Sequence, residues 1–147
     1  MTKILVVYHS MSGNTKAAAE AVAQGAKSIE GTEVATKEGL KAESQDLIDC
    51  DGVAVGTPDY FSYMAGGLKD FFDRTFYPTK GEVEGKPCAI FVTHGGGGTA
   101  VESVQDIAES FKFEEVAEPV LVRGGPNPSA REKLFRLGEE LVNACKA

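Results

Sequence analysis

The chain has 147 residues, 42% of them hydrophobic and 25% charged, and its 15 basic and 22 acidic side chains give a formal net charge of −7. A chain of this length can bury a sufficient core without disulfides or metals, so we expect one domain over residues 1–147. The acidic balance argues against nucleic acid and anionic membranes as partners, and the absence of a membrane-length apolar run or a signal peptide predicts a cytoplasmic protein.

The first half of the chain alternates apolar segments with segments of helical periodicity. Residues 3–8 are too apolar for a half-exposed strand, which predicts a strand in the middle of a sheet. Residues 15–29 follow as a helix with a narrow face of small side chains. The more polar residues 33–37 indicate an outer strand, residues 42–48 a short helix, and residues 51–56 a buried strand.

The second half continues the alternation. We expect the strand at residues 51–56 to end before Pro58, because proline has no N–H to donate to a sheet. Residues 64–76 and 99–111 have the apolar stripe of amphipathic helices. Residues 87–93 and 116–122 are predicted strands.

The last predicted helix begins after a Gly-Gly-Pro-Asn-Pro segment. Ser129 occupies the expected N-cap, Glu132 three residues later would complete a capping box, and the helix would run to about Cys145. Five strands alternating with about five helices predict an α/β fold, in which crossover helices cover a parallel sheet.

Three cysteines are spread along the chain as Cys50, Cys88 and Cys145, and no two of them have C-x-x-C spacing. An odd number at such distances supports neither a disulfide framework nor a zinc site. We therefore interpret them as buried structural thiols.

Ligands of open parallel sheets bind beyond the carboxyl ends of the strands, so the loops after the first, third and fourth predicted strands are the candidates for a site. In the first loop, Ser10, Ser12 and Thr15 supply hydroxyls and Gly13 lets the backbone curl before a helix begins. These groups and the unpaired N–H groups of the helix start predict a phosphate cradle. The alternative is an ordinary capping loop.

The other two loops are also unusual. Tyr60, Phe61 and Tyr63 place three aromatic rings within four residues of the loop after the third strand, which indicates a planar apolar ligand or, alternatively, packing into the core or a partner. The loop after the fourth strand contains His94 and the four glycines of residues 95–98. A glycine run lets the backbone lie flat against a ligand and offer N–H donors.

Two segments resemble known flavoproteins. The opening segment is similar to the flavodoxin signature, at Val6, Val7, Tyr8, Ser10, Gly13, Thr15, Ala19 and Val22. The segment from Gly56 to Arg74, G-T-P-x-Y-F-x-x-M-x-x-x-L-K-x-F-x-D-R, resembles flavodoxin-like FMN reductases and NAD(P)H:quinone oxidoreductases. The resemblance implies a flavodoxin-like three-layer sandwich, with a five-stranded parallel sheet in the order 2-1-3-4-5, helices on both faces, and FMN as cofactor.

The same resemblance implies which residues would contact FMN. The phosphate would be held by Ser10, Met11, Ser12, Gly13, Asn14 and Thr15. The isoalloxazine ring would be lined by Thr57, Pro58, Asp59, Tyr60 and Phe61, with Tyr60 or Phe61 against a ring face or edge. The pyrimidine end would meet Thr93, His94, Gly95, Gly96, Gly97 and Gly98. His94 would either donate a hydrogen bond to the flavin or a substrate, or serve as a structural histidine.

Three functions follow from the resemblance, and none needs a catalytic side chain or a metal, because the flavin supplies the redox chemistry. An electron carrier between redox partner proteins is favoured, since the chain contains no obvious nicotinamide-binding insertion. A small NAD(P)H-dependent FMN or quinone reductase is the alternative, which the aromatic and glycine loops favour. The third is a non-catalytic, FMN-dependent interaction module. The acidic charge predicts partners with a basic docking face, and we expect a monomer or a weak dimer.

Overall fold

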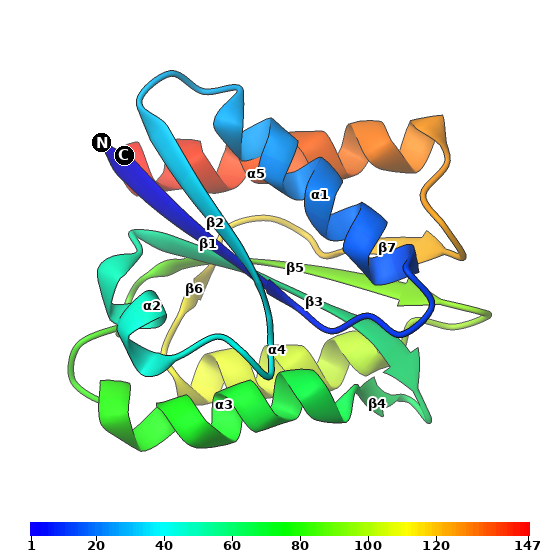
Figure 1. The fold of residues 1–147 in the computed structure, drawn as a ribbon, viewed down its shortest axis with the longest axis horizontal. Helices are drawn as coiled ribbons and strands as arrows, with labels where there is room; N and C mark the ends of the chain where they lie inside the picture. Colours follow the sequence, from blue (N-terminus) through cyan, green and yellow to red (C-terminus); the bar gives the residue numbers. More distant parts are fainter.

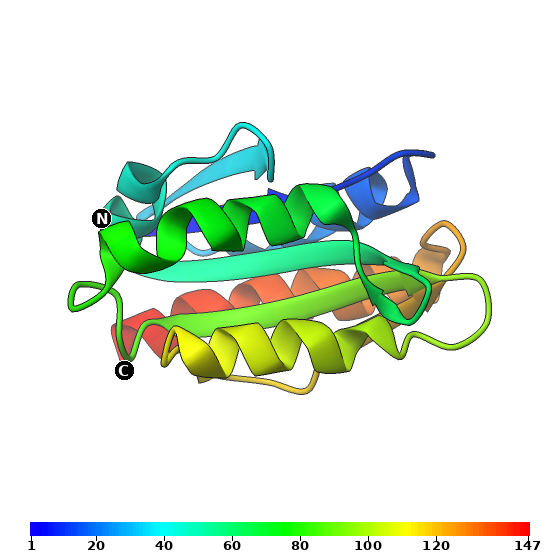
Figure 2. The ribbon, with the colours of Figure 1, turned by 90° about the horizontal axis from the view of Figure 1, so that it is seen from below.

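The computed structural model describes all 147 residues, which form a sheet between two layers of helices (Figures 1 and 2). The strands are β1 (Thr2–Tyr8), β2 (Thr32–Glu38), β3 (Gly52–Tyr60), β4 (Tyr63–Met64), β5 (Pro87–His94), β6 (Glu114–Glu115) and β7 (Val120–Arg123). The helices are α1 (Asn14–Lys27), α2 (Ser44–Asp49), α3 (Gly66–Thr79), α4 (Ala100–Ser110) and α5 (Pro128–Lys146). Helices α1 and α5 cover one face of the sheet, and α3 and α4 cover the other.

The strand order confirms the predicted topology. The strands pair in the order β2-β1-β3-β5, and both β6 and β7 pair with β5, all of them parallel. With β6 and β7 counted as one position, this is the order 2-1-3-4-5. The predicted number of five strands was wrong, because the last position is divided in two and β4 adds a short antiparallel strand beside the end of β3. Residues 63–64 are therefore strand, and α3 begins at Gly66 rather than at residue 64.

The last predicted strand, residues 116–122, is interrupted at its start. Glu115 pairs with Cys88 and Val120 pairs with Phe91, so residues 116–119 lie opposite only two residues of β5. Two extra residues break the register, and Pro119 has no N–H for the ladder. Only the second half of the prediction was correct.

Strand β3 does not end before Pro58, as predicted, but continues to Tyr60. The carbonyl of Gly56 accepts a hydrogen bond from His9 at the end of β1, so Gly56 faces the β1 side of β3. Pro58, two residues further on, faces the same side, where β1 has already ended. The lack of an N–H on Pro58 therefore breaks no hydrogen bond between strands, and Pro58 stays in register with Thr93 of β5.

The two faces of the sheet pack differently. On β1, Leu5 and Val7 contribute to a core with the aromatic side chains of α3 and the aliphatic side chains of α4, whereas Ile4 and Val6 point to α1 and α5. The alternation follows from the period of two residues along a strand. On the second face, α1 and α5 come into backbone contact, because a Cβ on Gly25 would collide with the carbonyl oxygen of Phe135. Small residues on α1 are thus required by packing.

Helix α5 begins at a different residue from the one predicted. Asn127 is the N-cap, and its Oδ1 accepts a hydrogen bond from the Ala130 N–H at 2.8 Å. Pro128 takes the first helical position, where its fixed φ fits and no N–H is needed. Ser129 therefore lies inside the helix, and Glu132 pairs with Arg136 instead of completing a capping box.

All three cysteines are free thiols, and Cys50 and Cys88 are buried. Burial raises the pKa of the Cys50 thiol to about 12 and that of the partly buried Cys145 thiol to about 11. These thiols stay protonated at neutral pH and are poor nucleophiles, in agreement with a structural role. None of the helices is long and apolar enough to cross a membrane.

Candidate functional site

The loops after β1, β3 and β5 meet beyond the carboxyl ends of the strands, on the right of Figure 1. Thr15 and Thr93 join the first loop to the third, because their Oγ1 atoms lie 2.7 Å apart in the buried interior. Asp59 joins the second loop to the start of α4, through the Ala100 N–H at 3.1 Å. The structure thus brings together the three segments in which the sequence predicted the site residues.

The first loop presents a group of N–H donors that no protein atom accepts. Within the loop, only the Gly13 N–H has a partner, the Ser10 Oγ at 3.1 Å, and helical bonding starts with the Ala17 N–H. From Met11 to Lys16 the free donors are the N–H groups of Met11, Ser12, Asn14, Thr15 and Lys16. No side chain caps the helix, so this start of α1 combines free donors with the positive end of the helix dipole, an arrangement suited to an anion such as a phosphate.

Gly13 gives the first loop its curvature. Its φ of 101° lies in the left-handed region, where an L side chain is strained. Ser12 and Gly13 are exposed, whereas Thr15 is buried beneath them. The loop therefore presents its donors outward while Thr15 fastens it to β5.

The second loop is a tight hairpin between β3 and β4. Tyr60 pairs with Tyr63, and the two-residue turn between them, Phe61 and Ser62, has φ values of 57° and 64°. Phe61 is fully exposed, Tyr63 is 44% exposed and Tyr60 is half-buried. The alternative in which these aromatics pack into the core is wrong for Phe61 and Tyr63. Phe61 stands at the tip of the hairpin, beside the candidate site.

The polar groups of the hairpin are largely engaged within the protein. The Thr57 hydroxyl, completely buried, accepts a hydrogen bond from the Ala65 N–H at 2.8 Å. The Asp59 carboxylate accepts the Ser62 N–H at 2.8 Å with Oδ1 and the Ala100 N–H with Oδ2. These two side chains shape the hairpin from within.

The third loop is held by its own histidine. His94 Nδ1 accepts the Gly97 N–H at 3.1 Å, and the His94 carbonyl accepts the Gly124 N–H at 2.9 Å. The accepting Nδ1 places the ring proton of the neutral form on Nε2, which has no partner. Around Gly95, Gly96 and Gly97 there is open space where a side chain would stand. The loop therefore offers bare backbone on that side.

Sequence reasoning missed several residues at this edge. His9 lies against Gly67, where an added Cβ would collide with the His9 Nδ1, and its ring is edge-on to Tyr60 at 6.3 Å between centroids. Gly125, after β7, approaches Asn14 so closely that an added Cβ would lie 3.2 Å from the Asn14 Oδ1. Ala100 binds Asp59 by its backbone. Nothing local in the sequence marks these contacts, since the partners are distant along the chain.

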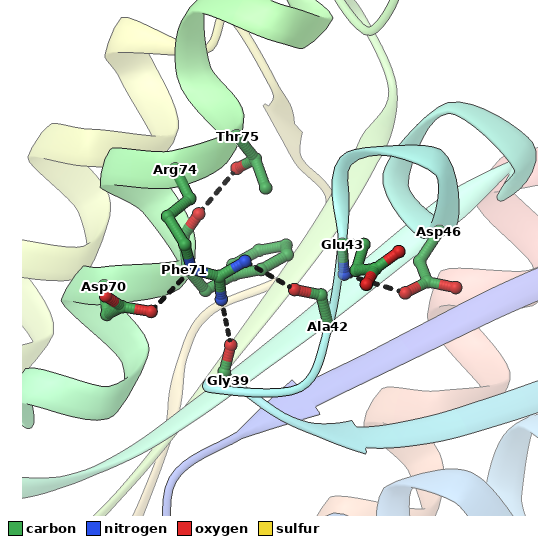
Figure 3. Close-up of polar contacts among 8 residues, drawn as sticks. All are labelled: Gly39, Ala42, Glu43, Asp46, Asp70, Phe71, Arg74 and Thr75. Atoms are coloured by element: carbon green, nitrogen blue, oxygen red, sulfur yellow. Dashed lines mark hydrogen bonds and ion pairs between the residues drawn. The ribbon is translucent and has the colours of Figure 1, made fainter.

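The charged residues that follow the aromatic segment anchor α3 (Figure 3). Arg74 donates hydrogen bonds to the carbonyl oxygens of Gly39 at 2.7 Å and Ala42 at 3.0 Å, and to Asp70 at 2.6 Å. The guanidinium thus ties α3 to the connection between β2 and α2. Arg74, at the end of the segment that resembles FMN reductases, therefore stabilises the packing of α3 and does not belong to the candidate site itself.

A hollow of about 540 Å³ lies elsewhere, at the amino ends of β1 and β2, between Lys3, Glu33 and Asp46. The amino ends of the strands are remote from the loops described above. Open α/β sheets bind ligands at the opposite edge. We therefore assign the candidate site to the loops at the carboxyl ends.

Comparison with known proteins agrees with this placement. Residues 2–124 match the family described as NADPH-dependent FMN reductase. The chain is 43% identical to a flavodoxin of Aquifex aeolicus over 117 residues, covering 77% of this chain and 63% of that one. It is 34% identical to an NAD(P)H dehydrogenase (quinone) of Acidithiobacillus ferrooxidans over 128 residues, covering 70% and 64%. The chain thus spans less than two thirds of the length of these two relatives.

Among solved structures, an archaeal flavodoxin superposes with a TM-score of 0.89 at 27% sequence identity, covering 99% of this chain and all of the other. This superposition confirms the predicted flavodoxin-like fold. The family match confirms the resemblance seen in the sequence and the class of cofactor. The chain belongs to the NADPH-dependent FMN reductase family, whose flavodoxin-like members bind FMN.

Proposed function

We propose that this protein binds FMN across the three loops and carries electrons between redox partner proteins. FMN, when bound, supplies the electron-accepting and electron-donating chemistry that side chains lack. The phosphate would be held by residues 10–15, with the ring between the hairpin of Tyr60 and Phe61 and the loop of residues 93–98. The relative named as a flavodoxin supports this assignment.

The observation that carries the FMN site is the set of free N–H groups at the start of α1. Five of them point to no protein acceptor, and the Ser12 hydroxyl and the Thr15–Thr93 pair lie in the same place. Such a group binds a phosphate without a basic side chain. The requirement for a dianionic ligand end distinguishes FMN from riboflavin.

An electron carrier needs a ligand edge that a protein partner can reach. Phe61, at the hairpin tip, is fully exposed. No principal hollow of the surface is lined by residues 57–61 or 93–98, so these two loops do not enclose a deep pocket that would keep a protein partner away. The net charge of −7 would steer partners with a basic docking face. We place such partners, and this protein, in the cytoplasm.

A small NAD(P)H-dependent FMN or quinone reductase is the second candidate. The open space around Gly95, Gly96 and Gly97 favours it, because a loop without side chains leaves one ring face accessible to a nicotinamide or quinone. The relative named NAD(P)H dehydrogenase (quinone) points the same way. The two candidates share the FMN site and differ in the source of electrons.

Anaerobic reduction of the FMN-loaded protein separates them. A carrier is expected to keep its visible flavin absorbance for many minutes after NADPH or NADH is added, and to lose it when a reductase partner is supplied. Rapid bleaching by NAD(P)H alone would overturn the carrier. Photoreduction complements the assay, since one-electron transfer predicts two resolved reduction steps and hydride transfer predicts one.

A glycine-loop variant sharpens the same experiment. Gly96→Leu puts a side chain into open space without a positive φ to strain it. In a reductase it would slow bleaching by NAD(P)H while FMN stays bound. In a carrier, direct bleaching is slow before and after the substitution.

A further inference from the structure

Asp59 connects two loops that are far apart in the sequence. Its Oδ1 accepts the Ser62 N–H at 2.8 Å, within the β3–β4 hairpin. Its Oδ2 accepts the Ala100 N–H at 3.1 Å and lies 3.5 Å from the Thr99 Oγ1, at the start of α4. The Asp59 carboxylate therefore links two segments, because one oxygen binds the hairpin and the other binds the end of the glycine loop.

Helix α4 depends on this contact for a cap. Thr99 stands at the N-cap but makes no side-chain bond to the helix N–H groups. Free N–H groups at a helix start need acceptors when they are buried, and Ala100 is buried. Asp59 supplies the acceptor from β3, and its negative charge also suits the positive end of the helix dipole.

A second contact binds the hairpin to the same turn of α4. The Met64 N–H donates to the Ser103 Oγ at 3.0 Å, and this hydroxyl donates to the Ala100 carbonyl at 2.6 Å. Met64 and Ser103 are both buried. The hairpin is thus attached to α4 on both of its strands, by Asp59 from β3 and by Met64 from β4.

The hairpin tip needs such support. Phe61 and Ser62 both have positive φ, which non-glycine residues seldom adopt in succession. The Ser62 N–H is held by Asp59. Without that acceptor the turn could relax to a wider one, and Phe61 would move with it.

We propose that Asp59 is a positioning residue that sets the separation between the hairpin tip and the glycine loop, and so the width of the slot for a planar ring. The inference rests on the proposed function, because these two loops are the ones assigned to the isoalloxazine. It also revises the expectation that Asp59 touches the ring: both carboxylate oxygens are engaged by the protein, and the residue acts through its two loops.

Asp59→Asn separates the two connections. The single amide oxygen can accept only one of the two N–H groups, and we expect it to keep the shorter contact, to the Ser62 N–H at 2.8 Å rather than to the Ala100 N–H at 3.1 Å. Glu102→Gln is the matched control, because Glu102 is an exposed acid in the first turn of α4 whose side chain makes no hydrogen bond in this structure. Both variants remove one negative charge near the same helix start.

Two measurements test the proposal. Fluorescence titration of the flavin-free protein is expected to show that Asp59→Asn weakens FMN and riboflavin binding by the same factor, roughly tenfold, the loss typical of a hydrogen bond to a charged group. Glu102→Gln is expected to change either affinity by less than about twofold. Circular dichroism and urea unfolding of the flavin-free variants check that the fold is intact, because a partly unfolded protein would also lose affinity for both ligands by an equal factor.

Amide hydrogen exchange supplies a readout without flavin. The Ala100 amide is expected to exchange faster in Asp59→Asn than in the wild type or in Glu102→Gln, while the Ser62 amide stays protected. Ser103→Ala removes the second attachment and is expected to weaken the binding of FMN and of riboflavin by an equal factor. This variant keeps the test available should Asp59→Asn fold poorly.

The outcomes distinguish this inference from the proposed function. If the wild type binds no FMN, the proposed function fails, and exchange at Ala100 still decides whether Asp59 holds the two loops. If the wild type binds FMN but Asp59→Asn matches Glu102→Gln in both affinities, the positioning role is overturned. Loss of FMN affinity alone, with riboflavin unchanged, would also overturn it, since that pattern belongs to the phosphate loop.

Discussion

The two ends of the candidate site are built in opposite ways. At the phosphate end, five N–H groups have no protein acceptor and a single buried contact, Thr15 to Thr93, holds the loop to the sheet. At the ring end, the Thr57 hydroxyl, the Asp59 carboxylate and the His94 Nδ1 form hydrogen bonds within the protein, and only the His94 Nε2 is left without a partner. The first end offers donors to a ligand, whereas the second offers shape, open backbone and an exposed aromatic side chain.

The contrast teaches how the site would recognise its ligand. Unpaired donors give affinity for an anion, because a charged acceptor gains more from them than water does. Loops with satisfied polar groups keep a fixed spacing and gain affinity by burying a flat apolar surface. We therefore expect substitutions at the phosphate end to discriminate between FMN and riboflavin, and substitutions at the ring end to affect both equally.

The largest expected effect is at the phosphate end, in Ser12→Ala combined with Thr15→Val. Hydroxyls that face a phosphate would contribute about 1.5–3 kcal/mol each as charge-assisted hydrogen bonds, and Thr15→Val also breaks the buried contact with Thr93 that holds this loop. FMN affinity should therefore fall by roughly a hundredfold or more, and riboflavin affinity by less than about threefold, as measured by fluorescence quenching.

Ser129→Ala is the control for this double variant, because Ser129 is an exposed serine in the first turn of another helix, α5. It should leave both affinities unchanged. Equal losses of FMN and riboflavin in the double variant would show that residues 10–15 do not hold the phosphate.

A smaller effect is expected for Gly13→Ala, which tests the curvature of the same loop. The φ of 101° makes a side chain there cost about 1–2 kcal/mol, although no atom stands in its way. Urea unfolding should show that loss, and FMN affinity should fall roughly tenfold because the donors no longer converge.

Gly66→Ala provides the comparison, since Gly66 also has open space but lies in the first turn of α3 without a positive φ. Alanine there should stabilise the protein by a few tenths to about 1 kcal/mol. The same loss of stability in both variants would mean that the left-handed conformation of Gly13 is not the cause.

The smallest expected effect is at the ring end, in Phe61→Gly. Phe61 is fully exposed and has a φ of 57°, so glycine removes no core packing and relieves the turn, for a gain of about 1 kcal/mol in unfolding free energy. Affinity for FMN and for riboflavin should fall by the same factor, roughly three- to tenfold, if the ring packs on a flavin.

Tyr77→Gly is unsuitable as a control because glycine would weaken α3, but Tyr77→Ala serves, since Tyr77 is 77% exposed in the last turns of that helix. It should leave flavin binding unchanged. A Phe61→Gly variant that binds both flavins like the wild type would remove Phe61 from the ring slot.

Much of the fold was predictable because its signals are local. The branched apolar segment of β1, the small-residue face of α1 and the glycine-bearing loop between them depend on neighbours within a few residues. The same holds for the phosphate end, where hydroxyls, a glycine and a helix start follow one another in the chain.

Two of the errors arose where a distant segment decides the local structure. Pro58 stays in β3 because β1 ends beside it. Residues 116–119 leave the sheet because they have twice as many residues as the stretch of β5 opposite them. The start of α5 moved to Asn127 because Pro128 fits the first helical position, a local signal that the Ser129 and Glu132 pattern obscured.

By itself, the sequence determined the α/β alternation, the strand order implied by the family likeness, and the composition of the loop that we propose for the phosphate, since hydrophobic period, loop composition and helix starts are properties of contiguous residues. Only the tertiary structure decided how the ring end is built. Asp59 accepts a hydrogen bond from Ala100, which lies 41 residues further along the chain, and Ser103 accepts one from Met64. Hydrogen bonds between remote segments depend on packing in three dimensions, which leaves no periodic pattern along the chain.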